Sequence, residues 1–419
     1  MSGAMGHAGR GSAFRTGSAG LSRDLNRVAV LRLIGASGPI ARTHIAQMLG
    51  LSPATVTSLT RELLDRGVVR VAEHAPSRGG RPAVLLELVG GAATSLGVKI
   101  APDHLVGVVV DLDAHVLERF ELKFDATTRD SVDRIADVLE SWIDAAATHG
   151  PLLGIGLGVP GVVDAERRTV SSPTLGWEHV SLSNLLHQRL GVPVVVDNDV
   201  NTLAVSERLY GRGRDVENFL TVTTGLGVGL GIVVGGDIYH GYGGGAGEFG
   251  HVSAVDDGPP CSCGKHGCLE AVIADPALVA LARARGILTN RQGIRKLRAL
   301  ADAEDSGAAE IFAAAGAVLG RAVAGLVNVL SPELVLISGE GTQGWAHMAA
   351  EFDRALRSNI FPLLRGVAVE VDPWDDVKWA VGAAALVLRA TFTPRDERQA
   401  DNSIRSWLLA QPSGMEVVA

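Results

Sequence analysis

Apolar and polar residues in the first ninety positions follow a helical period three times in succession. The first run covers residues 24–37 and a shorter one covers about 42–49. The third begins at Pro53, whose missing N–H costs nothing at a first helical position. Ser52, just before it, can cap the helix. Gly67 is placed to end it. The apolar positions that predict these helices are Leu25, Val28, Leu31 and Ile34, then Ile45, Ala46 and Leu49, then Val56, Leu59 and Leu63.

Two short runs of strand type follow, at 68–72 and 83–88, with the loop HAPSRGGRP between them. The order helix, helix, turn, helix, hairpin resembles a winged helix-turn-helix. We therefore predict such a domain over residues 21–90, preceded by a disordered arm at 1–20 that is rich in Gly, Ser, Ala and Arg. The alternative is a small helical subdomain with a solvated third helix.

The third predicted helix turns its small polar side chains away from its apolar stripe. Near a helix N-terminus such side chains can meet base edges and phosphates in a major groove. In the loop, Arg78 and Arg81 flank two glycines. Two arginines on such a flat segment can enter a narrow minor groove, which concentrates negative potential. An ordinary exposed loop is the alternative for this segment. The predicted DNA contacts on the helix are Ser52, Ala54, Thr55, Thr57, Ser58 and Arg61.

Charge separates this first segment from the rest of the chain. Residues 1–90 carry eleven Arg, no Lys and five acidic residues, whereas the whole chain has a net charge of −8. A basic segment on an acidic body indicates that only the first segment meets a polyanion. A solvated basic face would give the same balance.

Beyond a joint at 89–93, runs of strand type alternate with runs of helical type. This alternation predicts an α/β domain over 91–393, with a second lobe starting near Phe219 and a loose tail at 394–419. The predicted strands are 96–100, 106–112, 154–159, 192–196 and 334–337, and the predicted helices are about 131–148, 200–210, 276–285, 307–329 and 378–390.

The 419 residues, 47% of them hydrophobic, are enough for two to three domains. No run of 18 uncharged apolar residues occurs, and the first twenty residues have no apolar leader. We therefore expect a cytoplasmic protein without a membrane span.

The cysteines of the chain, Cys261, Cys263 and Cys268, lie within eight residues and follow His251. Three thiolates and one imidazole form a closed tetrahedral set for zinc, without an open position for a substrate. We therefore predict a structural Zn²⁺ site, since clustered cysteines in a cytosolic protein favour a metal over a disulfide. His266 inside the loop is a rival ligand, and three unrelated thiols are the alternative.

Several motifs together resemble the ROK family (repressor, open reading frame, kinase). The match covers about 92–390 and adds the winged helix that the repressors of the family carry. The motifs, in order, are GVPGVVD at 158–164, SPTLGW at 172–177, VDNDVN at 196–201, TTGLGVGLG at 223–231, GEFGH at 247–251, CSCGKHGCLE at 261–270 and VGAAAL at 381–386.

The resemblance implies a two-lobed domain of the hexokinase/actin (ribonuclease H-like) type, with a sugar in the cleft. Lobe 1 would span about 91–200 plus the C-terminal helix, and lobe 2 about 201–377. Carboxylates, an amide and an imidazole suit sugar hydroxyls, which both donate and accept. A turn or helix cap is the alternative for residues 197–199, and an ordinary loop carboxylate for position 248. The implied sugar ligands are Asn198, Asp199, Glu248, His251 and Glu270.

The resemblance fails where a ROK kinase holds its nucleotide. A kinase begins lobe 1 with a DxGxT hairpin, and here Lys99 stands in place of its Asp. Ala101 and Pro102 replace two glycines, and Asp103 replaces the Thr, which removes an N–H donor and adds a charge that repels phosphate. The second glycine-rich turn, at 224–229, survives in part, and the late GG-type nucleotide motif is altered to SGEG at 338–341. We therefore predict no kinase activity, with Asp199 acting only as a hydroxyl acceptor.

These features predict a sugar-responsive repressor that binds a palindromic double-stranded operator as a homodimer or tetramer. Glucose, xylose, N-acetylated amino sugars and their phosphates all fit as effector, and activation instead of repression stays open. An active sugar kinase with a DNA-binding domain is one alternative. A DNA-binding protein controlled by a protein partner is another.

Overall fold

The computed structural model describes residues 19–72 and 84–392. The chain divides into two compact units, of which the first runs to Leu88 and the second from Val89 to Ala390. Arg78 and Arg81, predicted to contact a minor groove, lie outside the described residues.

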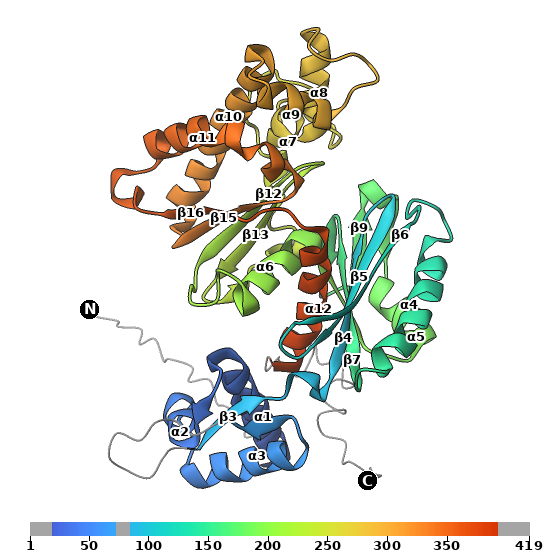
Figure 1. Cartoon of the computed structure of the whole chain (residues 1–419), viewed down its shortest axis with the longest axis vertical. Coiled ribbons are helices and arrows are strands. Elements are labelled where there is room, and N and C mark those ends of the chain that lie inside the picture. Colours follow the sequence, from blue (N-terminus) through green and yellow to red (C-terminus); the bar gives the residue numbers. More distant parts are fainter. Residues whose placement is uncertain (1–18, 73–83, 393–419) are drawn as a thin grey trace, which may run out of the picture. The chain divides into compact units, whose positions relative to one another are not determined.

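Within residues 19–72 and 84–88, the first unit has three helices and a three-stranded sheet (Figure 1). The order of the strands is β1-β3-β2, and both pairings are antiparallel. β1 is a two-residue strand that the sequence pattern did not predict. The other elements confirm the predicted winged helix-turn-helix. They are α1 (Ala19–Ser37), β1 (Ile40–Ala41), α2 (Arg42–Leu49), α3 (Pro53–Asp65), β2 (Val69–Val71) and β3 (Leu85–Leu88).

Local chemistry fixes α3. Ser52 caps it by accepting a hydrogen bond from the Thr55 N–H at 3.1 Å, and Pro53 occupies its first turn. Gly67, with φ of 68°, lets the chain turn into β2. The side chains of Leu25 and Val28 lie outside the described part. The buried residues that hold the three helices together include Leu31, Ile34, Ile45, Ala46, Val56, Leu59 and Leu63.

Lobe 1 of the second unit is built on a five-stranded sheet of order β11-β7-β4-β5-β6. β4, β5 and β6 are antiparallel, whereas β7 and β11 join in parallel. A small antiparallel sheet of β8, β9 and β10 follows β7. The elements are β4 (Thr94–Ile100), β5 (His104–Asp111), β6 (Val116–Lys123), α4 (Ser131–Ala147), β7 (Leu152–Val159), β8 (Val162–Asp164), β9 (Thr169–Ser172), β10 (Trp177–Val180), α5 (Leu182–Leu190) and β11 (Val194–Asn198).

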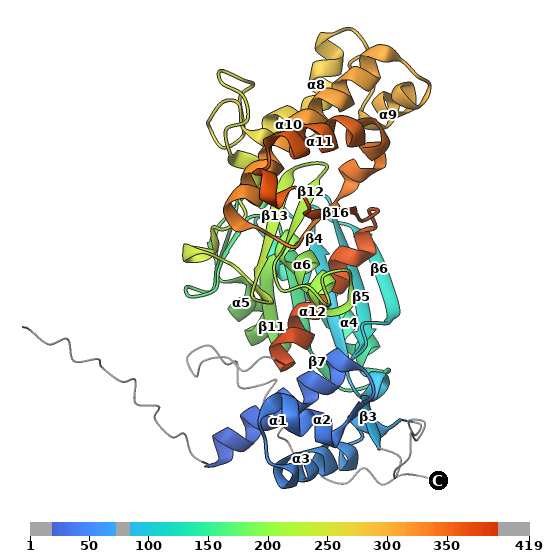
Figure 2. The same ribbon diagram turned by 90° about the vertical axis from the view of Figure 1, so that its left-hand side faces the viewer.

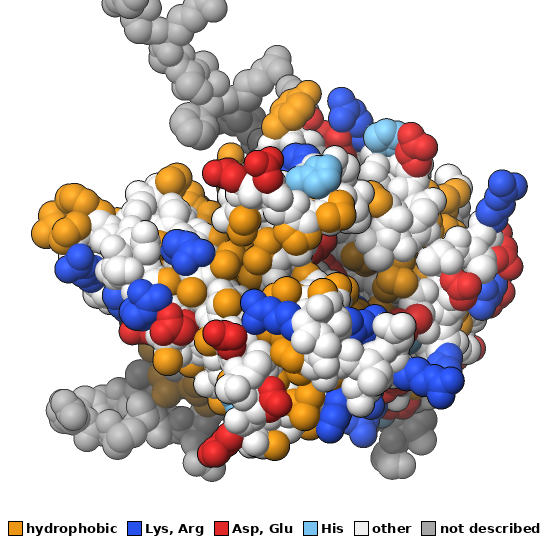
Figure 3. Space-filling view, turned by 90° about the horizontal axis from the view of Figure 1, so that it is seen from above, with side chains coloured by type: hydrophobic (Ala, Val, Ile, Leu, Met, Phe, Trp, Pro, Cys, Tyr) orange, Lys and Arg blue, Asp and Glu red, His pale blue; other side chains and the backbone are white. Residues whose placement is uncertain are grey.

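Lobe 2 is built on a second sheet, of order β14-β13-β12-β15-β16, with helices α7 to α11 (Figures 1 and 2). Seen from the α8 and α9 end, the coloured surface carries interspersed acidic and basic side chains (Figure 3). The elements are β12 (Phe219–Thr224), β13 (Val228–Val234), β14 (Asp237–Ile238), α7 (Leu269–Ile273), α8 (Asp275–Ala284), α9 (Ile294–Asp302), α10 (Ser306–Leu330), β15 (Leu334–Ser338), α11 (Trp345–Asn359) and β16 (Ala368–Val371).

Among the described helices, α10 has the length and hydropathy of a membrane span. Its apolar residues Phe312, Leu319 and Val323 are buried in the core of lobe 2 together with Phe352 of α11. We therefore interpret α10 as the central helix of that core, where a helix that is apolar over most of its surface is expected.

Two helices lie between the sheets, α6 (Asp199–Tyr210) and α12 (Asp376–Phe392) (Figure 1). Gly97 of β4 and Gly156 of β7 allow α12 to approach the lobe 1 sheet, because a Cβ at either position would collide with the α12 backbone. Farther along α12, Ala385 and Leu386 pack with Phe219 in the core beside lobe 2. α12 therefore contacts both lobes.

The structure confirms the predicted α/β alternation and shows elements that the pattern missed. β6 is mostly exposed and buries only Phe120, so its hydrophobic signal is weak. β16 is a short edge strand without a fully buried residue. The other missed elements are the short β8, β9, β10 and β14 and the helices α5, α7, α9 and α11.

Candidate functional site

The N-terminus of α6 carries two of the predicted sugar ligands. Asn198 ends β11 and caps α6, since its Oδ1 accepts from the N–H groups of Val200 at 2.9 Å and Asn201 at 3.3 Å. Its Nδ2 donates to the Gly161 carbonyl at 2.9 Å. Asn198 is therefore the helix cap considered from the sequence, and the second hydrogen of its amide lies outside these bonds.

Asp199 is the first residue of α6 and is half-buried. Burial raises the pKa of its carboxyl above the ordinary value, while Lys99 acts in the opposite direction and Glu340 adds to the increase. Such a carboxylate is poorly compensated, which makes it a strong acceptor for a hydroxyl that enters the site.

Glu270 of α7 lies beside the start of β13. Its Oε2 accepts from the Val228 N–H at 3.1 Å. One residue on, Gly229 packs so closely on Val200 that a Cβ there would collide with it. The start of β13 therefore has Glu270 on one side and the α6 N-terminus on the other, which brings the two predicted groups of ligands toward one another.

Glu248 and His251 come from the loop that precedes the cysteines. Glu248 Oε2 lies 3.8 Å from His251 Nε2, and the other ring nitrogen, Nδ1, lies 3.5 Å from Cys261 Sγ. His251 thus faces the sulfurs with one nitrogen and the Glu248 carboxylate with the other. Nearby, His240 Nε2 pairs with Asp197 Oδ2 at 2.8 Å, which ties the same loop of lobe 2 to the end of β11. Neither His240 nor this pairing was predicted.

His251, Cys261, Cys263 and Cys268 form a group whose ligand atoms lie within 4.8 Å of one another and could hold a metal ion. Tetrahedral zinc, about 2.3 Å from each sulfur, places neighbouring sulfurs about 3.7 Å apart. Cys263 Sγ and Cys268 Sγ are 3.6 Å apart. His266 is exposed and outside the group, so the rival ligand is not brought to it. The donor set and its spacing fit zinc.

The backbone of the cysteine loop is shaped for this arrangement. Gly264 and Gly267 adopt φ of 88° and 69°, and Lys265 Nζ donates to the His251 carbonyl at 2.6 Å. Burial and the two other thiols raise the pKa of Cys268 to about 11, whereas the Lys265 backbone N–H lowers the pKa of Cys263. A cation among the sulfurs would offset the cost of ionising them.

Lys99 is buried at the end of β4. Its Nζ lies 2.9 Å from Asp376 Oδ1, 3.9 Å from Glu340 Oε1 and 4.4 Å from the centre of the Trp379 ring. Ala101, Pro102 and Asp103 form the turn to β5. The acidic partners of Lys99 were not predicted, because they lie more than 200 positions away along the chain.

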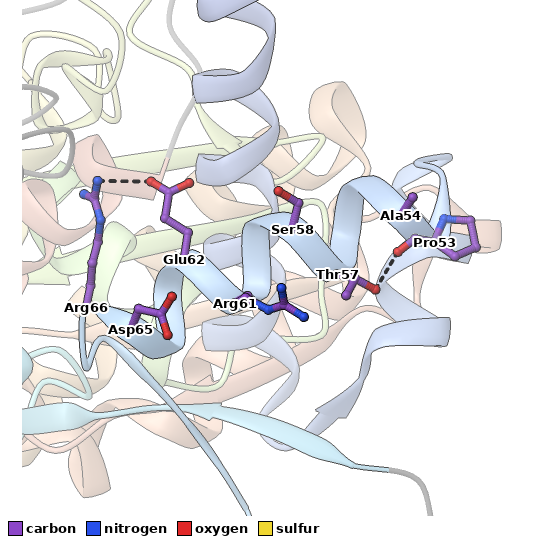
Figure 4. A pocket seen from close by; sticks show the side chains of 8 residues that line it. All are labelled: Pro53, Ala54, Thr57, Ser58, Arg61, Glu62, Asp65 and Arg66. Atoms are coloured by element: carbon purple, nitrogen blue, oxygen red, sulfur yellow. Dashed lines mark hydrogen bonds and ion pairs between the residues drawn. The ribbon is translucent and has the colours of Figure 1, made fainter.

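On α3, the side chains of Ser52, Ala54, Thr57, Ser58 and Arg61 are exposed, as predicted for a DNA-reading face. Thr55 is only half-buried rather than fully outward, because its hydroxyl pairs with Ser52 Oγ at 2.8 Å. Thr57 donates to the Pro53 carbonyl at 2.7 Å. Ala54, Thr57, Ser58 and Arg61 line an open hollow on the surface of α3, whereas Ser52 and Thr55 lie outside its lining (Figure 4).

Glu62 anchors this face of α3 to α1. Its carboxylate lies 3.0 Å from Arg66 (Figure 4) and 3.2 Å from Arg27. Arg23 approaches both Glu62, at 3.5 Å, and Ser58, at 3.2 Å. Arg23 was not predicted from the sequence. Its guanidinium is half exposed beside predicted contact Ser58, so it belongs to the same polar surface.

Residues 95–390 match the sequence model of the ROK family. The chain belongs to the ROK family. Its residues 24–76 match the model of the MarR family, which covers most of α1 and all of α2 and α3. Both matches confirm the family and the fold class expected from the motifs.

Known ROK regulators resemble this chain over most of its length. It is 29% identical to the DNA-binding transcriptional dual regulator NagC of Escherichia coli (strain K12), over 91% of this chain and 96% of NagC. It is 28% identical to the xylose repressor of Bacillus subtilis (strain 168), over 75% of this chain and 82% of the repressor. The crystal structure of a ROK family transcriptional regulator, a homologue of the E. coli MLC protein, has a TM-score of 0.79 at 26% identity and covers 89% and 97% of the two chains.

Proposed function

We propose that this ROK protein is a repressor of carbohydrate genes that releases its operator when a sugar binds. The observation that carries the proposal is that one chain joins a MarR-type unit to a ROK domain in which acceptors and donors for hydroxyls lie together. The relatives named above support it, since they are regulators rather than enzymes by name.

The sugar site comprises Asn198, Asp199, Glu248, His251 and Glu270. Asp199 and Glu248 accept from hydroxyls, while the free amide hydrogen of Asn198 donates to one. Glu270 is already bound to Val228, so it shapes the site through the β13 backbone as well as through its remaining oxygen. The chemistry suits a polyhydroxyl ligand, with a sugar or a sugar phosphate as the class of effector.

The DNA contacts of the proposal are those of the exposed α3 face, together with the loop arginines Arg78 and Arg81. The small side chains allow α3 to enter a major groove, and Arg61 supplies positive charge. A homodimer or tetramer would present two such helices to the half-sites of a palindrome. We place the protein in the cytoplasm, where its operator would be.

Zinc is proposed as a structural ion held by His251 and the three cysteines. When bound, it supplies charge that keeps the thiolates together and fixes the His251 ring. His251 Nε2 is then oriented toward Glu248, so the metal stabilises the geometry of a sugar contact.

The proposal includes no phosphoryl transfer, because Lys99 and its acidic partners fill the end of β4. An active sugar kinase is the second candidate, favoured by Asp199, which keeps the position of a base, and by the glycine-rich turn at 224–229, which survives in part. A coupled ATPase assay with hexoses and pentoses separates the two. Turnover that disappears in Asp199→Asn would establish the kinase instead.

Footprinting on the DNA around its own operon, followed by mobility shifts with a panel of sugars, tests the leading proposal. We expect a protected palindrome, and one sugar that weakens its binding. The sugar must bind the DNA-free state more tightly, since equal binding shifts nothing. Protection without a response to any sugar or sugar phosphate would point to control by a protein partner.

A further inference from the structure

A group of charges around the buried Lys99 lies where β4, α12 and the turn after β15 meet, close to Asp199 of the candidate sugar site. Lys99 is 7% exposed and pairs with Asp376 at 2.9 Å and Glu340 at 3.9 Å. Asp376 Oδ2 also lies 3.7 Å from His104 Nε2. Lys99 on the lobe 1 sheet therefore faces acids from α12 and from lobe 2.

Glu340 lies directly on the glycine-rich turn between β12 and β13. A Cβ at Gly225 would collide with the Glu340 carboxylate, and Cβ atoms at Gly339 or Gly341 would collide with Thr224. The two turns of lobe 2 are thus packed face to face, with the Glu340 carboxylate on the Gly225 backbone.

Arg298 links the two turns, directly at Glu340 and through Asp275 at Gly225. Its Nη2 lies 2.7 Å from Asp275 Oδ2 and 3.2 Å from the Glu340 carbonyl oxygen. The Asp275 N–H in turn donates to the Gly225 carbonyl at 2.8 Å. Glu340 is therefore held by its backbone as well as by Lys99. These contacts fix its carboxylate on the Gly225 backbone.

An exposed glycine-rich turn beside a lysine is suited to bind phosphate, because its N–H groups and the ammonium all favour an anion. Here the Glu340 carboxylate occupies the position on the turn where such an anion would bind. We propose that Glu340 is an internal plug that occupies a latent anion site formed by the Gly225 turn and Lys99. Removing its charge then opens the site to a phosphate-bearing ligand.

The plug also explains the local charge balance. Lys99 lies between Glu340 and Asp376 and near Asp199, so one ammonium compensates several carboxylates. With Glu340 neutral, Lys99 has charge to spare for an external anion. With Lys99 also neutral, only acids remain around the turn and an anion is repelled.

The test is calorimetric titration of the full-length protein with sodium pyrophosphate. We expect pyrophosphate to bind Glu340→Ala at least about tenfold more tightly than the unaltered chain, because a carboxylate at contact distance from the anion is gone. The double variant Lys99→Met with Glu340→Ala should lose that binding again. Glu351→Gln, which removes a half-buried charge elsewhere in lobe 2, serves as the matched control and should bind no more tightly than the unaltered chain.

Glu340→Gln keeps the volume of the plug and guards against a folding defect in the alanine variant, and circular dichroism verifies both. Glutamine removes the charge, so it should bind pyrophosphate as well, though less tightly than alanine. The proposal is overturned if the unaltered chain binds pyrophosphate as tightly as Glu340→Ala, or if the folded variants bind none. No sugar or DNA enters this test, so its failure leaves the repressor proposal untouched.

Discussion

At the scale of single residues, side chains of the candidate sugar site stabilise the fold and also keep polar atoms that can bind a ligand. Asn198 caps α6 and also keeps an amide hydrogen, and Glu270 holds β13 while keeping one oxygen. Asp199 differs, since it sits in a position that disfavours its charged form. A residue that costs stability in the free protein is typical of a binding site.

Asp199→Asn should therefore stabilise the free protein and abolish sugar binding. The folded-state pKa of Asp199 lies above its ordinary value of 3.8, so ionisation of this side chain in the folded state weakens folding as the pH rises. The gain in melting temperature of the variant should appear as the pH rises above 3.8 and vanish below it. Thermal unfolding across pH, paired with sugar calorimetry, measures both effects. A variant less stable than the parent at neutral pH would contradict this account.

Sequence alone predicted the metal set because its ligands are close along the chain, whereas Lys99 required the fold. Lys99 was recognised as a departure from a motif, but Asp376, Glu340 and Trp379 carry no periodic signal that links them to it. Arg23 was missed for the same reason, since its contact with Ser58 crosses from α1 to α3.

At the scale of elements, α3 was predicted in full because its cap, its first-turn proline and its terminal glycine are all local. β6 and α9 were missed, since an edge strand and a short helix of nine residues bury too few residues to produce a clear pattern. On α3, Ser52 has both a structural role, as the helix cap, and a predicted role in contacting DNA. Substitutions at this position can separate the two.

Ser52→Ala should destabilise α3 by about 1 kcal/mol, because the Thr55 N–H loses its partner. Ser52→Asp keeps a capping oxygen and should preserve stability, yet it places a negative charge where a DNA phosphate would approach. Hydrogen exchange of the α3 amides and operator mobility shifts separate the two effects. Equal DNA binding by Ser52→Asp and the parent would remove Ser52 from the predicted contacts.

The metal loop gives a second prediction for an element. Cys268→Ser should lower bound zinc from one ion per chain to near none and weaken sugar binding, because His251 loses its anchor. Mass spectrometry of the metal and calorimetry with the effector provide the measurements. His266→Ala is the control: exposed and outside the ligand group, it should leave zinc and sugar affinity unchanged. Loss of zinc in that variant would show that the set of ligands is wrong.

At the scale of the whole molecule, the two units differ in charge as well as in fold. The excess of arginine in residues 1–90 predicts DNA binding that weakens steeply with salt. Arg61→Ala should make the slope of log K against log salt shallower by about one, if Arg61 neutralises one phosphate. Titrations at several salt concentrations measure the slope, and an unchanged slope would place Arg61 away from the backbone of the DNA.

Coupling between the units yields the last prediction. If sugar binding weakens operator binding by some factor, the operator must weaken sugar binding by the same factor, because both effects measure one coupling free energy. For an ordinary allosteric regulator this energy is about 1–3 kcal/mol, which corresponds to about 5–150-fold. Operator affinity at saturating sugar and sugar affinity at saturating operator, measured in one buffer, should therefore change equally. In Asp199→Asn both changes should disappear while operator affinity without sugar stays intact. Unequal factors in the parent protein would mean that the sugar acts on something other than the equilibrium of this chain, such as its assembly or a second partner.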